Sequence, residues 1–296
     1  MKKYYLIGEK LSHSYSKDIH SLFGLNYELK ELSAGEVGDF LQKKDFDGLN
    51  VTIPYKKTVI PYLDEVDEIA KSIGAVNTIV NENGKLKGYN TDYFGLKYAL
   101  SSAGIEIKDK RVAVLGSGGA SLTAQKLAED LGAAEISVVS RNGELNYANV
   151  YEKIDPQVII NATPVGMFPN ANGKPIELNK FKNLGGVFDC VYNPYRTRLV
   201  LNAEKLGIRA VGGLKMLAAQ GVYSEFLWGE TELTKEKIEL AYKNLFGKEV
   251  NIALIGMPGA GKTTVGQICA QRLHRPFFDT DEEIRRAPGR TPASII

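Results

Sequence analysis

The sequence has little cysteine, no long apolar run and almost no net charge, and each shortage excludes a class of protein. Its two cysteines, Cys190 and Cys269, form no CxxC pair and no Cys/His cluster, which argues against a disulfide scaffold or a zinc site and favours a reducing compartment. No apolar run approaches the roughly 20 residues of a membrane span, and the first run is broken at Glu9 and Lys10, too early for a signal peptide. The formal net charge of +2 does not indicate a nucleic-acid-binding surface. We therefore expect a cytoplasmic protein, a monomer or a homodimer, without nucleic-acid or membrane partners.

The 296 residues are enough for about two domains. Residues 1–100 alternate short strand-like and helical runs, and they include a hairpin with its turn at Asn83-Gly84. From Asp109 onward, continuous apolar runs such as RVAVLG and VIINATP alternate with helical segments, which is typical of parallel sheets. Residues 213–247 read as mostly helix, and a last unit begins at NIALIG. The sequence thus predicts an α/β fold.

The segment RVAVLGSGGAS places Gly116, Gly118 and Gly119 at a strand-to-helix turn. A pyrophosphate bound there would contact backbone N–H groups at the helix N-terminus, and a Cβ at the closest positions would hold it away. Ser121 replaces the third glycine of the GxGxxG pattern and is small enough for close helix–strand packing. A tight turn in an unrelated α/β domain is the alternative, but the flanking strand and helix favour a dinucleotide site.

The next predicted strand ends in Ser140-Arg141-Asn142. An enzyme that uses NAD usually places Asp or Glu there for the ribose 2′-hydroxyl, whereas an arginine suits the 2′-phosphate of NADP. The alternative is a solvated surface arginine. We expect NADP.

Many polar side chains lie near strand ends in the first hundred residues. Taken singly, each has an ordinary structural explanation, such as a helix cap, a turn or a solvated lysine. Ser14 and Ser16 are two residues apart and would point the same way from an extended strand. The other members are Asn50, Thr52, Lys56, Asn77, Asn90 and Asp92.

Eight motifs follow one another in the order SHSYS, NVTIPYK, GAVNT, YNTDYFG, GSGGAS, NATPVGM, VYNP and GLKMLAAQG. Together they closely resemble shikimate dehydrogenase, over roughly residues 1–247. The resemblance implies the reversible reduction of the small molecule 3-dehydroshikimate to shikimate by NADPH, in aromatic amino acid biosynthesis. We expect a shikimate-binding catalytic domain of residues 1–100 plus 213–247, because GLKMLAAQG must return Gln220 to the site, and a Rossmann NADP-binding domain of residues 101–212.

The resemblance also implies roles for individual residues, with Lys56 and Asp92 as the catalytic pair. Hydride transfer to a ketone builds negative charge on its oxygen, which needs a proton donor. A neighbouring carboxylate favours a charged lysine and burial disfavours it, so which of the two passes the proton stays open. The implied substrate-binding residues are Ser14, Ser16, Thr52, Asn77, Tyr192 and Gln220. The implied cofactor-binding residues are Gly116, Gly118, Gly119, Ala120, Ser140, Arg141, Asn161, Thr163, Gly213 and Met216.

Three positions depart from the family's usual pattern. Gly212 stands where Asp is frequent, Lys215 stands where a small residue is frequent, and Arg141 has no basic neighbour. A quinate/shikimate dehydrogenase that uses NAD is therefore one alternative. A non-catalytic NADP- or shikimate-binding module is another, although such a module would not need both Lys56 and Asp92.

A second glycine-rich segment, GMPGAGKT at residues 256–263, fits the GxxxxGK[ST] pattern of a P-loop. We expect a strand at Asn251–Ile255 before it and a helix after it. In such a loop Gly256 and Gly261 help the backbone to cradle phosphates, Lys262 reaches the β/γ oxygens and Thr263 holds Mg²⁺. With PFFDTDEEIRR behind it, the segment of residues ~250–296 resembles the start of shikimate kinase, which implies that Asp279 lies near the metal.

One βα unit cannot bury both faces of an open parallel sheet. We therefore expect residues 250–296 to be a truncated kinase segment without activity, the front part of a two-enzyme fusion that stops before the remaining strands, the carboxylate-binding arginines and the lid. ATP and Mg²⁺ are expected only of a complete kinase domain.

Overall fold

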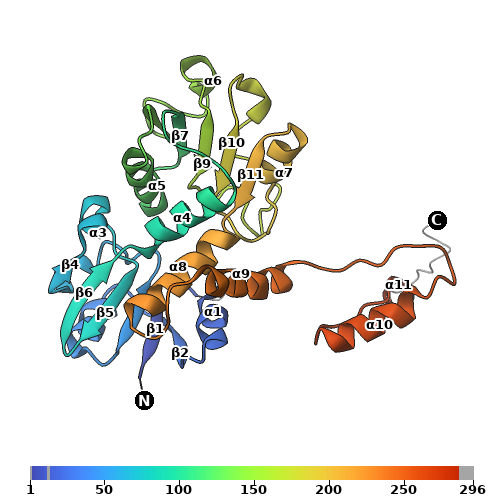
Figure 1. Ribbon diagram of the computed structural model, residues 1–296, viewed down its shortest axis with the longest axis horizontal. Coiled ribbons are helices and arrows are strands. Elements are labelled where there is room, and N and C mark those ends of the chain that lie inside the picture. Colours follow the sequence, from blue (N-terminus) through green and yellow to red (C-terminus); the bar gives the residue numbers. More distant parts are fainter. Residues whose placement is uncertain (1, 12–13, 287–296) are drawn as a thin grey trace. The chain divides into compact units, whose positions relative to one another are not determined.

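A six-stranded mixed sheet organises the first part of the protein in the computed structural model, which describes residues 2–11 and 14–286 (Figure 1). Its strand order is β2-β1-β3-β5-β6-β4. The neighbours β1/β2, β1/β3 and β4/β6 are parallel, whereas β5 is antiparallel to both β3 and β6. The strands are β1 (Tyr4–Gly8), β2 (Tyr27–Glu31), β3 (Gly48–Val51), β4 (Glu65–Val66), β5 (Thr78–Glu82) and β6 (Lys85–Tyr89).

The hairpin expected at Asn83-Gly84 is confirmed, because β5 and β6 pair across this turn. Both turn residues have positive φ, 54° at Asn83 and 86° at Gly84, the conformation that Asn-Gly favours. Fully buried apolar side chains, among them Ile7, Leu49 and Ile79, form the core of this sheet. The helices that accompany it are α1 (Ser16–Leu22), α2 (Glu36–Lys43), α3 (Glu68–Ile73) and the 3-10 turn η1 (Ile60–Tyr62).

A second sheet has five strands, all parallel, in the order β11-β10-β9-β7-β8. Its continuous apolar runs are buried by helices, as parallel sheets require. From β7 the chain adds β8 on one side and β9 on the other, so a topological switch point lies at the carboxyl ends of β7 and β9, where α/β sheets bind ligands. The elements are β7 (Arg111–Leu115), α5 (Gly119–Asp130), β8 (Glu135–Val139), α6 (Val150–Lys153), β9 (Val158–Asn161), η2 (Leu178–Lys180), β10 (Gly186–Asp189), α7 (Arg198–Lys205) and β11 (Arg209–Gly212).

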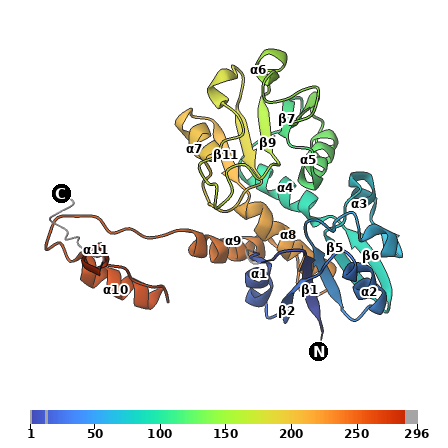
Figure 2. The ribbon, with the colours of Figure 1, turned by 180° about the vertical axis from the view of Figure 1, so that it is seen from behind.

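Two long helices connect the sheets. The chain passes from the first sheet to the second through α4 (Thr91–Ser102) and returns through α8 (Leu214–Leu227), and α9 (Lys235–Glu249) follows. Both ribbon views show α4 and α8 between the sheets (Figures 1 and 2). The two helices pack so closely that a Cβ on Gly95 would lie 2.6 Å from the Met216 carbonyl oxygen. The pair therefore forms a firm support for side chains at its ends.

The chain divides between Val250 and Asn251 into two compact units. In the second unit the described residues 251–286 form the helices α10 (Lys262–Arg272) and α11 (Thr280–Arg286). The strand expected at Asn251–Ile255 is wrong, because these residues adopt no regular structure. A lone strand has no neighbour for its backbone hydrogen bonds. The last ten residues of the expected kinase segment, 287–296, lie outside the described residues.

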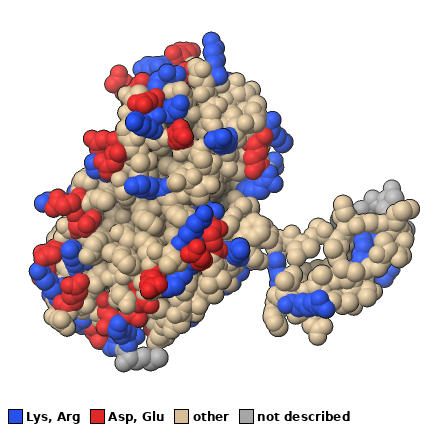
Figure 3. Space-filling model, in the orientation of Figure 1, with Lys and Arg blue, Asp and Glu red and all other residues tan. Residues whose placement is uncertain are grey.

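The α/β class expected from the sequence is confirmed by the two sheets and their helices. Among the described helices, none combines the length and the apolar character needed to cross a bilayer. On the face that Figure 3 shows, acidic and basic side chains alternate over the first unit and do not gather into a patch of one sign.

Candidate active site

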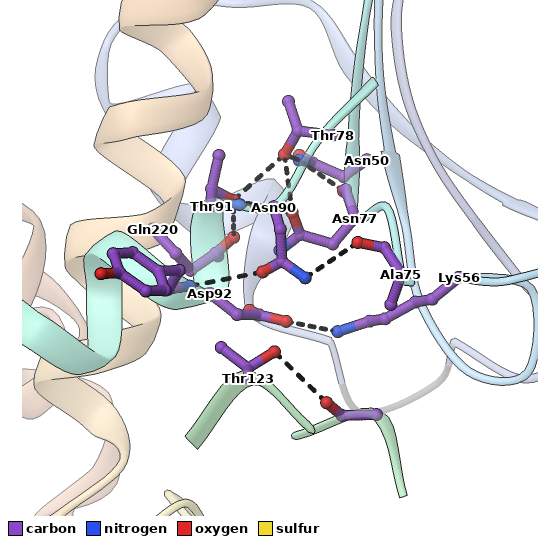
Figure 4. Close-up of polar contacts among 12 residues, drawn as sticks. Asn50, Lys56, Ala75, Asn77, Thr78, Asn90, Thr91, Asp92, Thr123 and Gln220 are labelled. Carbon is purple, nitrogen blue, oxygen red and sulfur yellow. Dashed lines mark hydrogen bonds and ion pairs between the residues drawn. The ribbon is translucent and has the colours of Figure 1, made fainter. Parts of the chain in front are cut away.

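Lys56 and Asp92 form an ion pair beyond the carboxyl end of β3, with 2.5 Å between Nζ and Oδ2 (Figure 4). Lys56 follows β3 after a turn closed by the Tyr55 N–H donating to the Thr52 carbonyl oxygen at 2.9 Å. Asp92 lies in the first turn of α4, where Asn90 caps the helix by accepting from the Tyr93 N–H. The side chains are 22% and 15% exposed, so the pair is held in place but can be reached from solvent.

A cluster of buried amides and hydroxyls lies beside this pair. Asn77 Oδ1 accepts from the Thr91 N–H at 2.7 Å and from the Thr91 hydroxyl at 3.1 Å. Gln220, on α8, accepts from the same hydroxyl at 3.2 Å and donates to the Leu217 carbonyl oxygen. The structure thus brings Lys56, Asp92, Asn77 and Gln220 together from four separate parts of the chain (Figure 4).

Three members of the cluster were missed by the sequence analysis, namely Thr78, Thr91 and Ser224. Their hydroxyls are mutually within hydrogen-bond distance, between 3.0 and 3.3 Å. Two signals point to them in retrospect. Thr91 stands between Asn90 and Asp92, and Ser224 lies one helical turn after Gln220, on the same face of α8.

Ser14 and Ser16 meet, with 3.2 Å between their hydroxyl oxygens. The extended strand expected here is wrong. Ser16 is the first residue of α1, and the Asp18 N–H already donates to the Tyr15 carbonyl oxygen. The helical turn brings the hydroxyls together instead. The Tyr192 ring lies 5.8 Å from that of Tyr15, the residue between the two serines, and burial raises the pKa of the Tyr192 hydroxyl.

The first glycine-rich turn has room for a ligand. Gly116 has a φ of 106°, which favours glycine for conformational reasons. Gly118 and Gly119 have negative φ, and a Cβ on either would meet no protein atom within 4 Å. Since nothing in the protein requires glycine at these two positions, the open space over the N-terminus of α5 fits an approaching pyrophosphate. Ala120, next along α5, is half-buried.

Ser121 takes the place of the third glycine and adds a contact of its own. Its side chain is buried, and its hydroxyl donates to the Gly116 carbonyl oxygen at 2.7 Å, which ties the turn to the helix. Arg141 follows β8 and is exposed, and its guanidinium makes no hydrogen bond or ion pair within residues 2–11 and 14–286. Ser140 beside it is half-buried.

Asn161 and Thr163 lie at the carboxyl end of β9, but they differ in access. Asn161 is fully buried, and its Oδ1 accepts from the Thr163 N–H and hydroxyl at 3.1 and 2.7 Å. Its Nδ2 donates to Asp189 at 2.9 Å. Burial raises the pKa of Asp189 to about 6, although hydrogen bonds from Thr197, Val191 and Asn161 each act to lower it. Asn161 thus supports the Thr163 loop from inside the protein.

Gly213 and Met216 lie at the start of α8, close to the end of β10. A Cβ on Gly213 would lie 2.2 Å from the Cys190 carbonyl oxygen, so this glycine is needed for close approach. Burial raises the pKa of the Cys190 thiol; the charges of Asp189 and Asp92 raise it further, and the charge of Lys56 lowers it. The ion pair therefore lies near the carboxyl edge of the second sheet. Lys215 faces α9, where it pairs with Glu239 at 3.0 Å.

The second glycine-rich loop has a different environment. Lys262 folds back, and its Nζ donates to the Gly256 and Met257 carbonyl oxygens at 2.9 Å each. Thr263 donates to Asp279 at 3.1 Å, so the two residues expected near a metal do meet. Ile255 and Met257 are 92% and 80% exposed, which shows that the loop has no core behind it.

Comparisons with known proteins cover both units of the chain. Residues 6–79 match the family model of the shikimate dehydrogenase substrate binding domain, and residues 258–296 match that of shikimate kinase. The shikimate dehydrogenase (NADP(+)) of Clostridium beijerinckii is 35% identical over 262 residues, which are 82% of this chain and 97% of that protein. The Clostridium perfringens (strain SM101) protein of the same name is 37% identical over 271 residues, which are 83% of this chain and 98% of that protein.

Solved structures agree with these relatives. A chorismate mutase/shikimate 5-dehydrogenase fusion protein from Clostridium acetobutylicum aligns with a TM-score of 0.79 and 35% identity, covering 84% of this chain and 98% of that one. The Thermus thermophilus shikimate 5-dehydrogenase, in complex with NADP(H) and shikimate, aligns with a TM-score of 0.74 and 30% identity, covering 82% of this chain and 99% of that one. With its two sheets, its Lys56–Asp92 pair and its open glycine turn, the chain belongs to the shikimate dehydrogenase family.

Proposed function

We propose that this protein is an NADP-dependent shikimate dehydrogenase, which interconverts shikimate and 3-dehydroshikimate. The observation that carries the proposal is the Lys56–Asp92 pair, 2.5 Å apart, beside the buried amides of Asn77 and Gln220. The pair lies near the carboxyl edge of the parallel sheet, where the open turn at Gly118 and Gly119 fits a dinucleotide. Relatives at 35–37% identity carry the name shikimate dehydrogenase (NADP(+)).

The chemistry divides between the cofactor and the ion pair. NADP⁺, when bound, would take the hydride from the substrate carbon. In oxidation Lys56 Nζ, as the neutral amine, receives the proton of the reacting hydroxyl and becomes the ammonium that pairs with Asp92; in reduction that ammonium returns the proton to the oxygen. Asp92 Oδ2 holds Nζ in position and accepts a hydrogen bond from a substrate hydroxyl. Because both groups are fixed by the β3 turn and by the capped start of α4, little reorganisation precedes proton transfer.

The remaining polar residues form two groups, each of which we assign to a different part of the substrate. We assign the substrate carboxylate to Ser14, Ser16 and Tyr192, whose side chains gather at the start of α1. Neutral donors of this kind bind a carboxylate without adding a charge that would compete for Asp92. We assign the ring hydroxyls to Thr52, Asn77 and Gln220. A substrate with one carboxylate and several hydroxyls satisfies both groups of residues.

The cofactor would lie along the carboxyl edge of the second sheet. Its pyrophosphate would bind the N–H groups of Gly118, Gly119 and Ala120 at the start of α5. Arg141, exposed and without a protein partner among the described residues, would pair with the 2′-phosphate beside Ser140. Thr163, Gly213 and Met216 would line the nicotinamide end, and Asn161 would support Thr163 from behind.

The test is the growth of the NADPH absorbance band after shikimate and NADP⁺ are added, repeated with NAD⁺ and with quinate. We expect growth with shikimate and NADP⁺. Growth with shikimate and NAD⁺ but not with NADP⁺ would leave the proposed reaction in place and would overturn the role of Arg141. No growth in any combination, from folded protein that binds NADP⁺, would overturn the proposal in favour of a binding module.

We also infer the organisation of the chain. The two sheets support separate domains, with residues 1–100 plus 213–247 binding the substrate and residues 101–212 binding NADP. The match of residues 258–296 to shikimate kinase, with Thr263 and Asp279 in contact, supports an origin of the second unit in a fused kinase. Because Ile255 and Met257 are exposed, we expect no shikimate-dependent formation of ADP from ATP. Measurable formation of that ADP would contradict this inference.

A further inference from the structure

A chain of buried polar side chains runs behind the substrate-binding amides and ends in a carboxyl group. Glu225, on α8, contacts His20, on α1, with 2.7 Å between Oε1 and Nδ1. The other ring nitrogen, Nε2, lies 3.2 Å from Asn50 Oδ1. His20 and Glu225 are fully buried and Asn50 is 5% exposed, so water does not complete these contacts. Neither His20 nor Glu225 has a part in the chemistry proposed above.

The Asn50 amide is oriented by His20 Nε2 on one side and, on the other, by the Asn77 carbonyl oxygen, which can only accept and lies 3.4 Å from Nδ2. Its remaining partners are hydroxyls, which can donate or accept. The Tyr27 hydroxyl donates to Oδ1 at 2.7 Å, and Nδ2 donates to the hydroxyls of Thr78 and Ser224 at 3.0 Å each. Because Oδ1 can only accept, His20 Nε2 must carry a proton in order to donate to it. A bare Nε2 would place two lone pairs against each other in a buried site.

Contact with Glu225 at Nδ1 lets Nε2 keep its proton in either charge state of the carboxyl group. With a charged Glu225 the ring donates from both nitrogens, and with a neutral Glu225 the carboxyl donates to Nδ1 instead. The proton moves along the Oε1–Nδ1 contact, and in both cases Nε2 keeps its own. Burial raises the pKa of Glu225, and its Oε2 has no partner within the described part of the chain. Glu230 and Lys237 are the other charges that act on it, and the Tyr27 ring stacks on His20 at 4.2 Å.

The orientation of Asn50 passes to the substrate-binding amides through three hydroxyls. Since Asn50 donates to Thr78 and Ser224, their own protons are free to point away from it. Ser224 donates to the backbone carbonyl oxygen of Gln220 at 3.0 Å, and Thr78 donates to Asn77 Oδ1 at 3.3 Å. Because the Thr91 N–H also donates to Asn77 Oδ1, the Thr91 hydroxyl can give its one proton to Gln220 Oε1 at 3.2 Å. Both amide oxygens thus receive donors from the protein. The Asn77 amide nitrogen and the second N–H of Gln220, whose first donates to the Leu217 carbonyl oxygen, remain to face the substrate.

We propose that Glu225 and His20 are a positioning pair: the Nε2–H of His20 fixes the Asn50 amide, so that Asn77 and Gln220 present N–H donors to the ring oxygens of the substrate. A reversed Asn50 amide would draw the Thr78 and Ser224 protons toward itself. Asn77, still held by the Thr91 N–H, and Gln220 would then compete for the one Thr91 hydroxyl proton. The proposal rests on shikimate as the substrate, but the protonation of Nε2 does not.

The first test compares two variants that differ in which ring nitrogen they replace. The amide nitrogen of His20→Gln reaches the place of Nε2 and can donate to Asn50, whereas that of His20→Asn reaches only the place of Nδ1. We expect the KM for shikimate to stay within about twofold in His20→Gln and to rise about tenfold in His20→Asn, for one lost hydrogen-bond donor. The KM for NADP⁺ and the kcat should change little, because the amides bind ground and transition states alike.

An equal rise of KM in both variants, or a rise that follows their melting temperatures, would mean a structural role and would overturn the proposal. A second measurement needs neither variant nor catalysis. Long-range ¹H–¹⁵N correlation spectra of the wild-type protein, which has three histidines, report which ring nitrogens carry protons. We expect a protonated Nε2 on His20 at neutral pH. An unprotonated Nε2 would contradict the proposal even in a protein with full activity, and a protonated one in an inactive protein would show that only the proposed reaction is wrong.

Discussion

Two glycine-rich turns in this chain both fit phosphate-binding patterns but have very different surroundings. GSGGAS follows β7, which pairs with β8 and β9, and Ser121 ties the turn to α5. GMPGAGKT follows residues 251–255, which form no strand, and Lys262 donates to two carbonyl oxygens of its own loop. The first turn offers open space over a fixed helix N-terminus, whereas the lysine of the second is occupied by the loop itself.

The difference shows that a short sequence motif can specify a glycine-rich turn, but that a phosphate-binding site also needs the tertiary structure that holds the turn open. A strand in a sheet holds its turn at a fixed position, and buried neighbours such as Asn161 and Asp189 hold the facing loop. Without a sheet behind it, the loop of residues 256–263 is not held open. The charged Lys262 side chain bonds to carbonyl oxygens of this loop.

Removing Lys56, the proposed acid–base group of the first unit, should have the largest effect. We expect Lys56→Ala to lower kcat for shikimate oxidation by about 10³-fold, the order that general acid–base groups contribute. The matched control is Lys57→Ala, since Lys57 is the exposed neighbour in the sequence. Steady-state rates of NADPH formation would measure both. Equal losses in the two variants would remove Lys56 from the reaction.

Asp189 should make the stability of the first unit depend on pH. Its pKa is raised from 3.8 to about 6 by burial, so the folded protein holds this proton more tightly than the unfolded chain. The stabilisation is fully present below about pH 4 and is lost as the pH rises through about 6, a change of about 3 kcal/mol in the free energy of unfolding. Asn at this position imitates the protonated carboxyl.

Urea denaturation of the wild type and Asp189→Asn, from about pH 4.5 to about pH 7.5, would show this dependence. We expect the variant to gain stability relative to the wild type as the pH rises. A difference that stays constant with pH would mean that the hydrogen bonds from Thr197, Val191 and Asn161 outweigh burial.

The open space at the first turn can be tested by filling it. A Cβ on Gly118 meets no protein atom, so Gly118→Ala should raise the KM for NADP⁺ at least about tenfold by occupying the place of the pyrophosphate. Gly35→Ala is the matched control, because Gly35 also caps a helix, α2, and a Cβ there meets nothing within 4 Å. Both variants should show the same small decrease in the free energy of unfolding. An unchanged KM in Gly118→Ala would place the cofactor elsewhere.

The smallest effect is expected in the second unit. Among the described residues, Lys262 Nζ bonds to carbonyl oxygens of its own loop, and no residue assigned to the substrate or the cofactor lies beyond Gln220 in the sequence. We therefore expect Lys262→Ala to leave kcat and both KM values within about twofold of the wild type, the range of ordinary surface substitutions. A larger change would show that the P-loop takes part in the dehydrogenase reaction.

Sequence reasoning predicted those features that depend on local pattern or on a family motif. The Asn83-Gly84 hairpin and the strand–turn–helix at Gly116 follow from short-range preferences and were confirmed. The extended conformation at Ser14 and the strand at Asn251–Ile255 were wrong, because the first depends on a helical start and the second on partner strands. His20 and Glu225 are 205 residues apart, and only folding brings α1 and α8 together. No local pattern identifies such a pair.

One measurement tests the contrast between the two units most directly. The wild-type protein is incubated with shikimate, NADP⁺, ATP and Mg²⁺ together, and the products are identified by mass spectrometry. We expect only the oxidised product, lighter than shikimate by two hydrogens, formed at the Lys56–Asp92 site. A phosphorylated product would show that the second loop works without the core that we consider necessary, and unchanged shikimate would contradict the dehydrogenase assignment itself.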